Sequence, residues 1–465
     1  MSRKDPPSQH LRDLAAQVEG EPDDEYASIP PDEMNGNHGR TIAAAAAWRL
    51  HLCTREVKMG DAYIEIVKPI AANVTTILRH HPQWVGVVAY DEFREAIVSL
   101  KAPPWDPEDA PATIVAGEWS DADSCRLIAW LARHERLDVP DKAAEAGLSV
   151  AAHANVIHPV RDYLRGLVWD GTPRLATMLP VLFGTAQGLY EEGVGTRWMI
   201  SCVARIMNPG CQVDCTMILE GATGRGKTSA FRALVPDPSW YADSGIDVGD
   251  KDSYGALRAV WIYGLDELDS LRKGEVTRIK NFLTATRDHY RPPYAKRARD
   301  FLRQNVFGGT TNETEYLIDR TGNRRFWPVR VDQNVDVAGI VAARDQLWAE
   351  ALHRYREGEP WHVDTPGFRT LCEAQQAERL QEDPWTPMVI GWIKSPKTGD
   401  GPPLDLRNGV ATVDVLVYCL QVRRADIETR QSMRVGAILR ELGYVRMRRQ
   451  EDGERGYVYV LPIAA

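Results

Sequence analysis

Residues 221–228 read Gly221-Ala222-Thr223-Gly224-Arg225-Gly226-Lys227-Thr228, which matches the phosphate-binding pattern G-x-x-x-x-G-K-[ST] at every position. A short apolar run at 216–219 precedes this stretch, and residues 228–234 have the composition of a helix. The alternative is a glycine-rich turn that caps a core helix. Because the order of strand, loop and helix is the context that the pattern requires, the flanks favour a phosphate loop.

This stretch predicts that the chain binds ATP together with Mg²⁺. Its three glycines let the backbone N–H groups turn inward around phosphate oxygens at the positive end of a helix. We expect Lys227 to reach the β and γ phosphates and the Thr228 hydroxyl to ligate Mg²⁺. The predicted nucleotide-binding residues are Gly221, Ala222, Thr223, Gly224, Arg225, Gly226, Lys227, Thr228 and Ser229.

A pair of acids follows the next strand-like run. Residues 259–265 are mostly apolar and end at Asp266 and Glu267. Two carboxylates at a strand end can divide the work, with Asp266 holding Mg²⁺ and Glu267 polarising the attacking water. The alternative is a solvated pair that opens a helix, where negative charge is favoured.

Two further motifs complete the predicted catalytic set. A third strand-like run, 305–312, ends at Asn312, which we expect to orient water against the γ-phosphate, although Asn is also a common turn former. Arg324 and Arg325 form a planar, permanently charged pair suited to the γ-phosphate. If a neighbouring subunit supplies this arginine, hydrolysis needs an oligomer. A surface ion pair is the alternative.

Several motifs together resemble one family. They are His158-Pro159-Val160-Arg161-Asp162-Tyr163-Leu164, Trp169-Asp170-Gly171-Thr172-Pro173-Arg174, the phosphate loop, Arg291-Pro292-Pro293-Tyr294, Gly309-Thr310-Thr311-Asn312 and Thr321-Gly322-Asn323-Arg324-Arg325-Phe326-Trp327. The sequence is similar to the virulence-associated E family, found on phages, prophages and related mobile islands. This resemblance covers about residues 155–335 strongly and the flanks weakly.

The resemblance implies an ATPase core similar to superfamily III helicases, an AAA+-like fold. It makes Lys227 and Thr228 the Walker A pair, Asp266 and Glu267 the Walker B acids, Asn312 the first sensor, and Arg324 or Arg325 the arginine finger, with Arg320 an open alternative. The chain departs from the family where Gly264 stands, because an acid often occupies that place. Which carboxylate acts as the base is therefore open.

A basic segment lies between the acid pair and Asn312. Residues 287–303 hold six basic and two acidic side chains, interleaved with aromatic rings, which suits contact with single-stranded phosphates and bases. Superfamily III helicases insert a hairpin at this place, with Lys296 and Arg297 here expected at its tip. The predicted DNA-binding residues are Arg291, Tyr294, Lys296, Arg297 and Arg299. A solvated basic loop is the alternative.

The pattern of elements predicts the domain order. Strands alternating with helices from about 213 to 332 indicate a three-layer α/β sandwich. A helix at 432–442 and a hairpin at 444–460 with its turn at Asp452-Gly453 indicate a winged-helix-like module. The expected parts are a disordered acidic tail (1–40), a small α/β N-terminal region (41–111), a helical collar (112–208), the P-loop core (209–335), a helical extension and linker (336–403) and the winged-helix-like domain (404–465).

The composition of the 465 residues limits the class of protein. With 44% hydrophobic and 26% charged residues it is ordinary globular material. No apolar run approaches the roughly 20 residues that span a bilayer, and the first residues lack the apolar core of a signal peptide, so we expect a cytoplasmic protein without membrane contact. Seven scattered cysteines fit free thiols. The net charge of −9 argues against uniform coating of DNA.

These patterns favour an ATP-driven DNA motor of a phage or mobile element, a helicase or primase-helicase-like replication protein. We expect a homo-oligomer, a hexameric ring, that acts on single-stranded or forked DNA and contacts other replication proteins. A second reading is a nucleotide-gated regulator that binds DNA or replication proteins without unwinding. A small-molecule kinase fits less well, because the chain carries a basic insertion and an arginine pair. Residues 41–150 contain no zinc module, so priming is not expected.

Overall fold

The computed structural model of the chain places most residues after the acidic N-terminal segment. The described residues are 47–109, 116–243, 252–265, 273–291, 298–317, 323–381, 383–397, 406, 409–451 and 454–462. Their contacts divide the chain into two units, Met1–Arg379 and Leu380–Ala465. Among the described residues, the first unit contains two large hydrophobic cores, and we call the parts around them the N-terminal body (47–157) and the central body (158–379).

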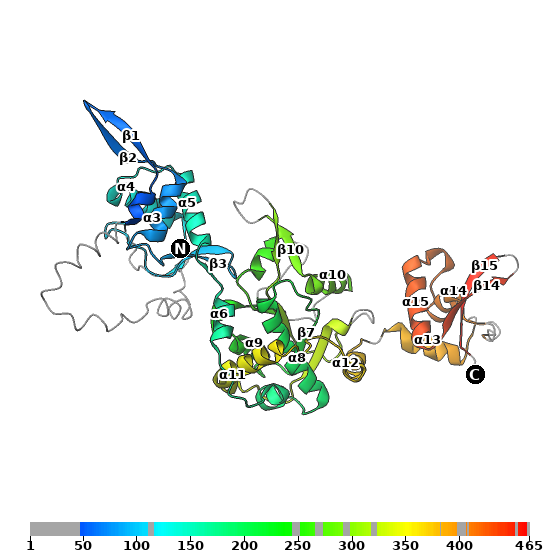
Figure 1. The fold of residues 1–465 in the computed structure, drawn as a ribbon. Helices are drawn as coiled ribbons and strands as arrows, with labels where there is room; N and C mark the ends of the chain where they lie inside the picture. The colour runs from blue at the N-terminus through cyan, green and yellow to red at the C-terminus, as the bar shows by residue number, and fades with distance from the viewer. Residues whose placement is uncertain are drawn as a thin grey trace. The chain divides into compact units, whose positions relative to one another are not determined.

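The central body is built on a five-stranded parallel sheet (Figure 1). The strands are β7 (Thr216–Glu220), β8 (Tyr241–Ala242), β9 (Ile262–Leu265), β12 (Val306–Thr311) and β13 (Phe326–Arg330). They lie in the order β13-β7-β12-β9-β8. Every residue of β7 and β12 is buried, as expected for parallel strands covered on both faces. The sheet therefore agrees with the mixed α/β class predicted from the sequence.

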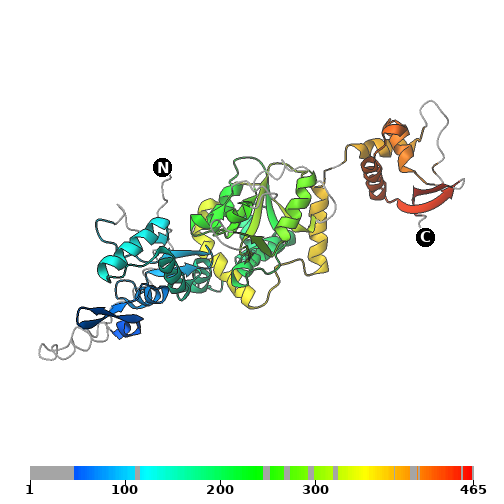
Figure 2. The same cartoon turned by 90° about the horizontal axis from the view of Figure 1, so that it is seen from above.

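Helices cover both faces of this sheet (Figure 2). They are α6 (Pro159–Gly166), α7 (Met178–Leu182), α8 (Leu189–Met207), α9 (Lys227–Leu234), α10 (Lys273–Thr284), α11 (Val337–Arg356) and α12 (Pro366–Glu378). Side chains alternate across β12, so Gly308 and Phe307 face opposite sides. Gly308 lies against Phe231 of α9, whereas Phe307 packs on Phe282 of α10. The sheet is thus the middle of three layers.

The N-terminal body is a small α/β fold with a tryptophan-rich core. It contains β1 (Thr54–Met59), β2 (Ala62–Val67), α3 (Ala71–His80), β3 (Val88–Asp91), β4 (Ala96–Ser99), β5 (Gly117–Glu118), α4 (Asp121–His134), α5 (Asp141–His153) and β6 (Val156–Ile157). Its four-stranded sheet has the order β5-β4-β3-β6. Trp84 is fully buried and meets Trp105 and Trp130 edge to face. Helices α4 and α5 share this core, although the sequence placed them in a collar.

The second unit has its own core. It contains α13 (Trp385–Lys394), α14 (Thr412–Asp414), α15 (Thr429–Glu441), β14 (Val445–Glu451) and β15 (Glu454–Val460). The predicted C-terminal helix and antiparallel hairpin are present, and Tyr459 of the hairpin packs with Val435 and Leu439 of α15. The expected turn at 452–453 lies outside the described residues. The winged-helix assignment stays a prediction.

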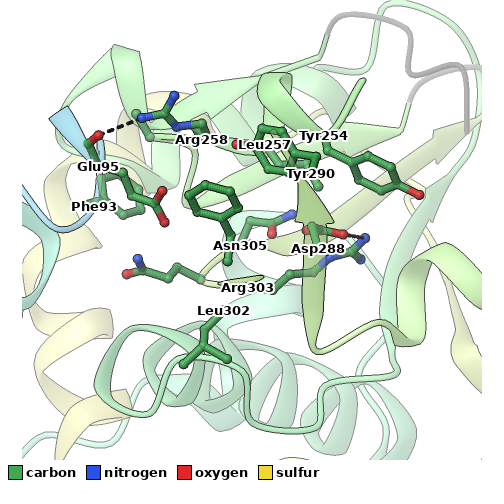
Figure 3. Close-up of a pocket in the computed structure, with 13 residues that line it drawn as sticks. Phe93, Glu95, Tyr254, Leu257, Arg258, Asp288, Tyr290, Leu302, Arg303 and Asn305 are labelled. Carbon is green, nitrogen blue, oxygen red and sulfur yellow. Dashed lines mark hydrogen bonds and ion pairs between the residues drawn. The ribbon is translucent and has the colours of Figure 1, made fainter. Parts of the chain in front are cut away.

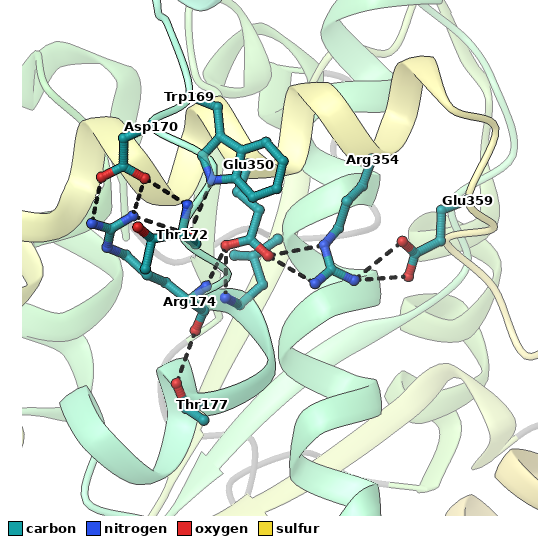
Figure 4. A network of polar contacts seen from close by, with 9 residues as sticks. Trp169, Asp170, Thr172, Arg174, Thr177, Glu350, Arg354 and Glu359 are labelled. Atoms are coloured by element: carbon teal, nitrogen blue, oxygen red, sulfur yellow. Dashed lines mark hydrogen bonds and ion pairs between the residues drawn. The ribbon is translucent and has the colours of Figure 1, made fainter.

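The motif at 169–174 has a structural role (Figure 4). Asp170 binds the Arg174 guanidinium through both oxygens, and the backbone N–H groups of Arg174 and Leu175 donate to the Glu350 carboxylate. Glu350 is fully buried in α11, where Arg354 also pairs with it. This network fixes the segment that leads into α7 against α11. The family-like motif therefore supports the fold and lies outside the nucleotide site.

We predict that Glu350→Ala destabilises the first unit. The substitution leaves two backbone N–H groups and Arg354 without their buried acceptor, which costs about 3 kcal/mol. Scanning calorimetry should show a loss of about 6–12 °C in melting temperature. The control is Glu359→Ala, because Glu359 pairs with the same Arg354 but is only half-buried, with 34% of its side chain exposed, so its removal should cost little. Equal shifts for the two variants would contradict the assignment.

Candidate nucleotide-binding site

The phosphate-loop sequence forms the turn from β7 into α9. Gly221, Gly224 and Gly226 have φ angles of +143°, +84° and +88°, which side-chain-bearing residues rarely adopt. A Cβ atom at Gly221 would lie 2.7 Å from the carbonyl oxygen of Val331, so a methyl group there would collide with backbone. The glycines thus permit the positive φ angles that the loop predicted from the motif requires.

Lys227 lies at the centre of this loop. Its ammonium donates to the carbonyl oxygens of Gly221 and Ala222 at 2.7 and 3.0 Å, and to Oδ1 of Asn312 at 2.9 Å. The side chain is only 7% exposed. A buried ammonium with three oxygen acceptors is held in one place, so its position across the loop is set before any phosphate arrives.

The strand order explains why Asn312 reaches Lys227. Asn312 follows β12, which pairs directly with β7 on one side and β9 on the other. Because all three strands are parallel, their carboxyl ends share one edge of the sheet. The loop that leaves β7 and the amide that follows β12 therefore meet. The contact joins the predicted Walker A lysine to the predicted sensor.

The two predicted acids follow β9 in the sequence, and β9 ends at the same edge of the sheet. Leu265, the last residue of β9, pairs with Gly309 of β12. Asp266 and Glu267 come next and lie outside the described residues. Thr228 is the second residue of α9, and Mg²⁺ usually takes only one or two protein ligands beside phosphate and water, so its hydroxyl is compatible with the predicted metal site. Within the described ranges, no three His, Cys, Asp or Glu residues gather into a metal cluster.

Gly264, which stands where the family often has an acid, lies in a place with little room for a side chain. A Cβ atom at this position of β9 would lie 2.4 Å from the Tyr241 hydroxyl oxygen and 3.2 Å from Cβ of Asp243. Tyr241 and Asp243 belong to the neighbouring strand β8 and the residue after it. An acidic side chain at position 264 would therefore displace this aromatic ring, and the glycine and the tyrosine fit each other.

The loop is also tied to the connection after β13. Arg225 donates from Nη1 to the Val331 carbonyl at 2.7 Å, and the Val335 N–H donates to the Arg225 carbonyl at 2.9 Å. Two further backbone N–H groups of this connection, at Asp332 and Gln333, donate to the Gly184 carbonyl. The sequence predicted Arg225 only as a loop residue. The hydrogen bonds of Arg225 join positions about a hundred residues apart in sequence, so no local sequence pattern could predict them.

A pocket of about 420 Å³ opens beside the loop. Its lining includes Gly221, Ala222 and Asn312, together with Glu220 and Arg379, which belong to a buried polar cluster that the sequence analysis missed. In that cluster the Arg379 guanidinium pairs with Glu220 at 3.0 Å, and the Tyr316 hydroxyl donates to Glu220 at 2.7 Å. Burial and the neighbouring carboxylate raise the pKa of Tyr316 well above its usual value, so it remains a donor. The cluster fixes the strand end that enters the loop.

The two predicted finger arginines lie at the opposite edge of the sheet. Arg324 and Arg325 immediately precede β13, whose first residue pairs with Thr216 at the amino end of β7. The phosphate loop begins at the other end of β7, about 13 Å away for a five-residue strand. The side chain of Arg324 is exposed. Neither arginine is thus placed on its own phosphate loop, and Arg320 lies outside the described residues.

The basic segment forms the hairpin that the resemblance implied. Strands β10 (Arg287–Tyr290) and β11 (Arg299–Leu302) pair antiparallel. Arg291 is exposed, and Arg299 contacts Glu95 at 3.5 Å. Three of the predicted DNA contacts, Tyr294, Lys296 and Arg297, lie outside the described residues.

Arg303, one of the six basic residues of this segment, is buried. Arg303 counted toward the positive charge of residues 287–303, but its side chain is only 1% exposed and binds Asp288 through two hydrogen bonds of 2.7 and 2.8 Å. The guanidinium also donates to the Phe282 carbonyl at the end of α10. This pair closes the base of the hairpin. The net charge of the segment therefore overstates the charge available to a ligand.

A small cavity of about 30 Å³ lies at the hairpin base (Figure 3). The Asp288–Arg303 pair lies at one end of it, and Glu95 and Arg258 lie together at the other. Glu95 comes from the N-terminal body, whereas Arg258 precedes β9. The cavity thus marks the place where the N-terminal body, the hairpin and the segment before β9 meet.

Part of the chain matches a known protein family, and solved structures align with the chain. Residues 164–381 match the family profile of the virulence-associated protein E-like domain, which confirms the resemblance predicted from the motifs. Two apo structures of the NrS-1 C-terminal region are 12% identical, each aligned over 81% of this chain and 96% of that chain with a TM-score of 0.45. A third aligns over 64% of this chain and 78% of that chain at 13% identity and a TM-score of 0.38. No curated protein matches the chain. Over the described ranges, no helix has the length and apolar character that a membrane crossing requires.

We predict that Gly221→Ala weakens ATP binding more than Gly224→Ala. The added methyl group at position 221 meets the Val331 carbonyl, whereas position 224 has no neighbour within 4 Å and suffers only from its positive φ. Displacement of the loop by the first substitution should cost about tenfold in affinity, the equivalent of one hydrogen bond. Titration with a fluorescent ATP analogue measures both variants. Equal affinities would show that the Val331 contact does not shape the loop.

Proposed function

We propose that this chain, whose residues 164–381 belong to the virulence-associated protein E-like domain family, is an ATP-hydrolysing DNA replication protein of a phage or mobile element. The observation that carries the proposal is the contact of Lys227 with the loop carbonyls and Asn312. A glycine-rich loop between a strand and a helix can also be an ordinary turn that caps the helix. A buried lysine held between that loop and the amide of the adjacent strand has the arrangement that a γ-phosphate requires.

Each loop residue then has a role in binding. The amides of the loop and the N-terminus of α9 face the phosphates, and Lys227 neutralises charge on the β and γ groups. Thr228 and Asp266 would hold Mg²⁺, which would withdraw negative charge from the phosphate. Glu267 would polarise the attacking water. Asn312 would orient that water, because its amide already lies within hydrogen-bond distance of the lysine.

The arginine pair supports an oligomeric enzyme. Arg324 and Arg325 begin the strand whose far end lies beside the phosphate loop, so an arginine from this pair reaches a phosphate more readily in a second copy. A head-to-tail contact between copies would bring the amino edge of one sheet to the carboxyl edge of the next. Such a heterologous contact closes into a ring when its rotation permits, and we propose a hexamer.

DNA contact is assigned to the hairpin β10–β11. Arg291 and Arg299 lie on the two sides of this hairpin, with seven residues between them in the sequence, and a basic hairpin suits the backbone of a single strand. A second contact is available in the other unit, where the Arg446 guanidinium stacks on the exposed Tyr457 ring at 3.7 Å. Coupling of hydrolysis to strand movement would make the protein a helicase.

We predict that single-stranded DNA accelerates ATP hydrolysis and that Lys227→Ala abolishes it. Loss of the ammonium removes a charge-assisted contact to the transferring phosphate, so turnover should fall at least about a hundredfold. Lys58→Ala, which removes an exposed lysine in β1, is the matched control. A strand-displacement assay on forked duplex tests unwinding. DNA binding without stimulation or unwinding would favour the nucleotide-gated regulator, and full activity of Lys227→Ala would exclude the assigned site.

We predict that two inactive variants restore each other. Lys227→Ala retains its arginines, and the double variant Arg324→Ala/Arg325→Ala retains its phosphate loop. When the two are mixed, some contacts between copies pair an intact loop with intact arginines, so ATPase activity should return to about a quarter of the wild-type level. Arg356→Ala, at an exposed arginine of α11, is the control for the substitution itself. A mixture as inactive as its components would contradict an arginine acting between copies.

A further inference from the structure

The turn between β3 and β4 anchors the N-terminal body to the central body. Phe93 at this turn is 3% exposed and belongs to the core of the central body, where it meets Trp240 and His158. Glu92 beside it pairs with Arg161 of α6 at 3.0 Å. The turn is therefore held firmly by apolar burial, and side chains next to Phe93 are placed at fixed positions against the central body.

Glu95 ends this turn in a constrained conformation. Its φ angle of +52° is uncommon for a residue with a side chain, and the Arg258 guanidinium donates to the carbonyl oxygens of Arg94 and Glu95, both at 2.8 Å. These contacts direct the Glu95 carboxylate toward the hairpin, where it meets Arg299 at 3.5 Å. Burial raises the pKa of Glu95, and the charges of Arg258 and Arg299 oppose that rise.

Two ion pairs of the hairpin differ in how easily they exchange partners. The Arg303–Asp288 pair is almost fully buried and has two short hydrogen bonds, so breaking it would leave an uncompensated charge. The other pair is a single long contact, in which the Arg299 side chain is 55% exposed and the Glu95 side chain 18% exposed. Pairs of that kind are weak and screened by salt. A phosphate can therefore replace Glu95 on Arg299, but no ligand can replace Asp288 on Arg303.

We propose that Glu95 is an autoinhibitory carboxylate that occupies Arg299 until the phosphate backbone of a single strand displaces it. This inference rests on the proposed function, because it assigns a competitor to the same hairpin. In the absence of nucleic acid, the N-terminal body holds the hairpin at its β11 side through the Glu95–Arg299 latch. Binding of a strand releases the latch, so the same event that engages DNA also loosens the hairpin from the turn between β3 and β4.

The test is the affinity of the full chain for a fluorescein-labelled oligo-dT strand. Glu95→Gln keeps the shape of the side chain and removes the competing charge, so it should tighten binding about two- to fivefold at low salt. The gain should shrink as salt screens the pair in the wild-type protein. In an Arg299→Ala background, Glu95→Gln should have no effect, because the competitor then has no target.

Glu92→Gln is the matched control. It removes the same charge three residues away on the same turn, but its partner is Arg161 rather than a hairpin residue. If Glu92→Gln tightens binding as much as Glu95→Gln, the effect is general repulsion and the latch is wrong. A gain from Glu95→Gln that persists in the Arg299→Ala background would overturn it as well.

The outcomes also separate the latch from the proposed function. If Arg291→Ala and Arg299→Ala each weaken binding while Glu95→Gln changes nothing, the hairpin binds DNA and the latch fails. If neither arginine variant alters the affinity, the hairpin is not the DNA contact, and the latch fails with it although the ATPase assignment stands. Melting temperatures within about 2 °C of wild type show that each substitution leaves the fold intact.

Discussion

The contact between Lys227 and Asn312 is the constraint on which the rest of the site depends. It requires β12 to lie directly beside β7, because only then do the phosphate loop and the amide share one edge of the sheet. That order also places the end of β9, the strand that Asp266 and Glu267 follow in sequence, one strand further along the same edge. Strand order, rather than any single motif, thus turns separated sequence patterns into one site.

The same parallel sheet separates groups that the chemistry needs together. A strand has two ends, and β13 presents Arg324 and Arg325 at one while its other end supports the loop through Val331. Under the proposed function, the arginines and the phosphate loop would form a complete site only when a second copy approaches. The N-terminal body is attached near the hairpin by Phe93, so under the proposed function its position would affect DNA contact more directly than it affects the phosphate loop.

Local spacing predicted the loop, the strand before Asn312 and the C-terminal helix with its two strands, because each depends on residues close together in sequence, whereas the hairpin β10–β11 was implied by the family resemblance. Contacts across long separations were not predictable. Glu220 and Arg379 are 159 residues apart, and Glu95 and Arg299 are 204 apart, so no periodicity joins them. Charge counting also misread Arg303, since a sum over a segment treats every arginine as exposed.

The most direct measurement of the central claim is an experimental structure of the protein with Mg²⁺ and a non-hydrolysable ATP analogue. The account predicts the β and γ phosphates against the amides of residues 222–228, with the Lys227 ammonium on the γ-phosphate side and Asn312 beside it. Nucleotide bound elsewhere, or a loop that keeps its lysine on the Gly221 and Ala222 carbonyls with no phosphate in reach, would contradict it.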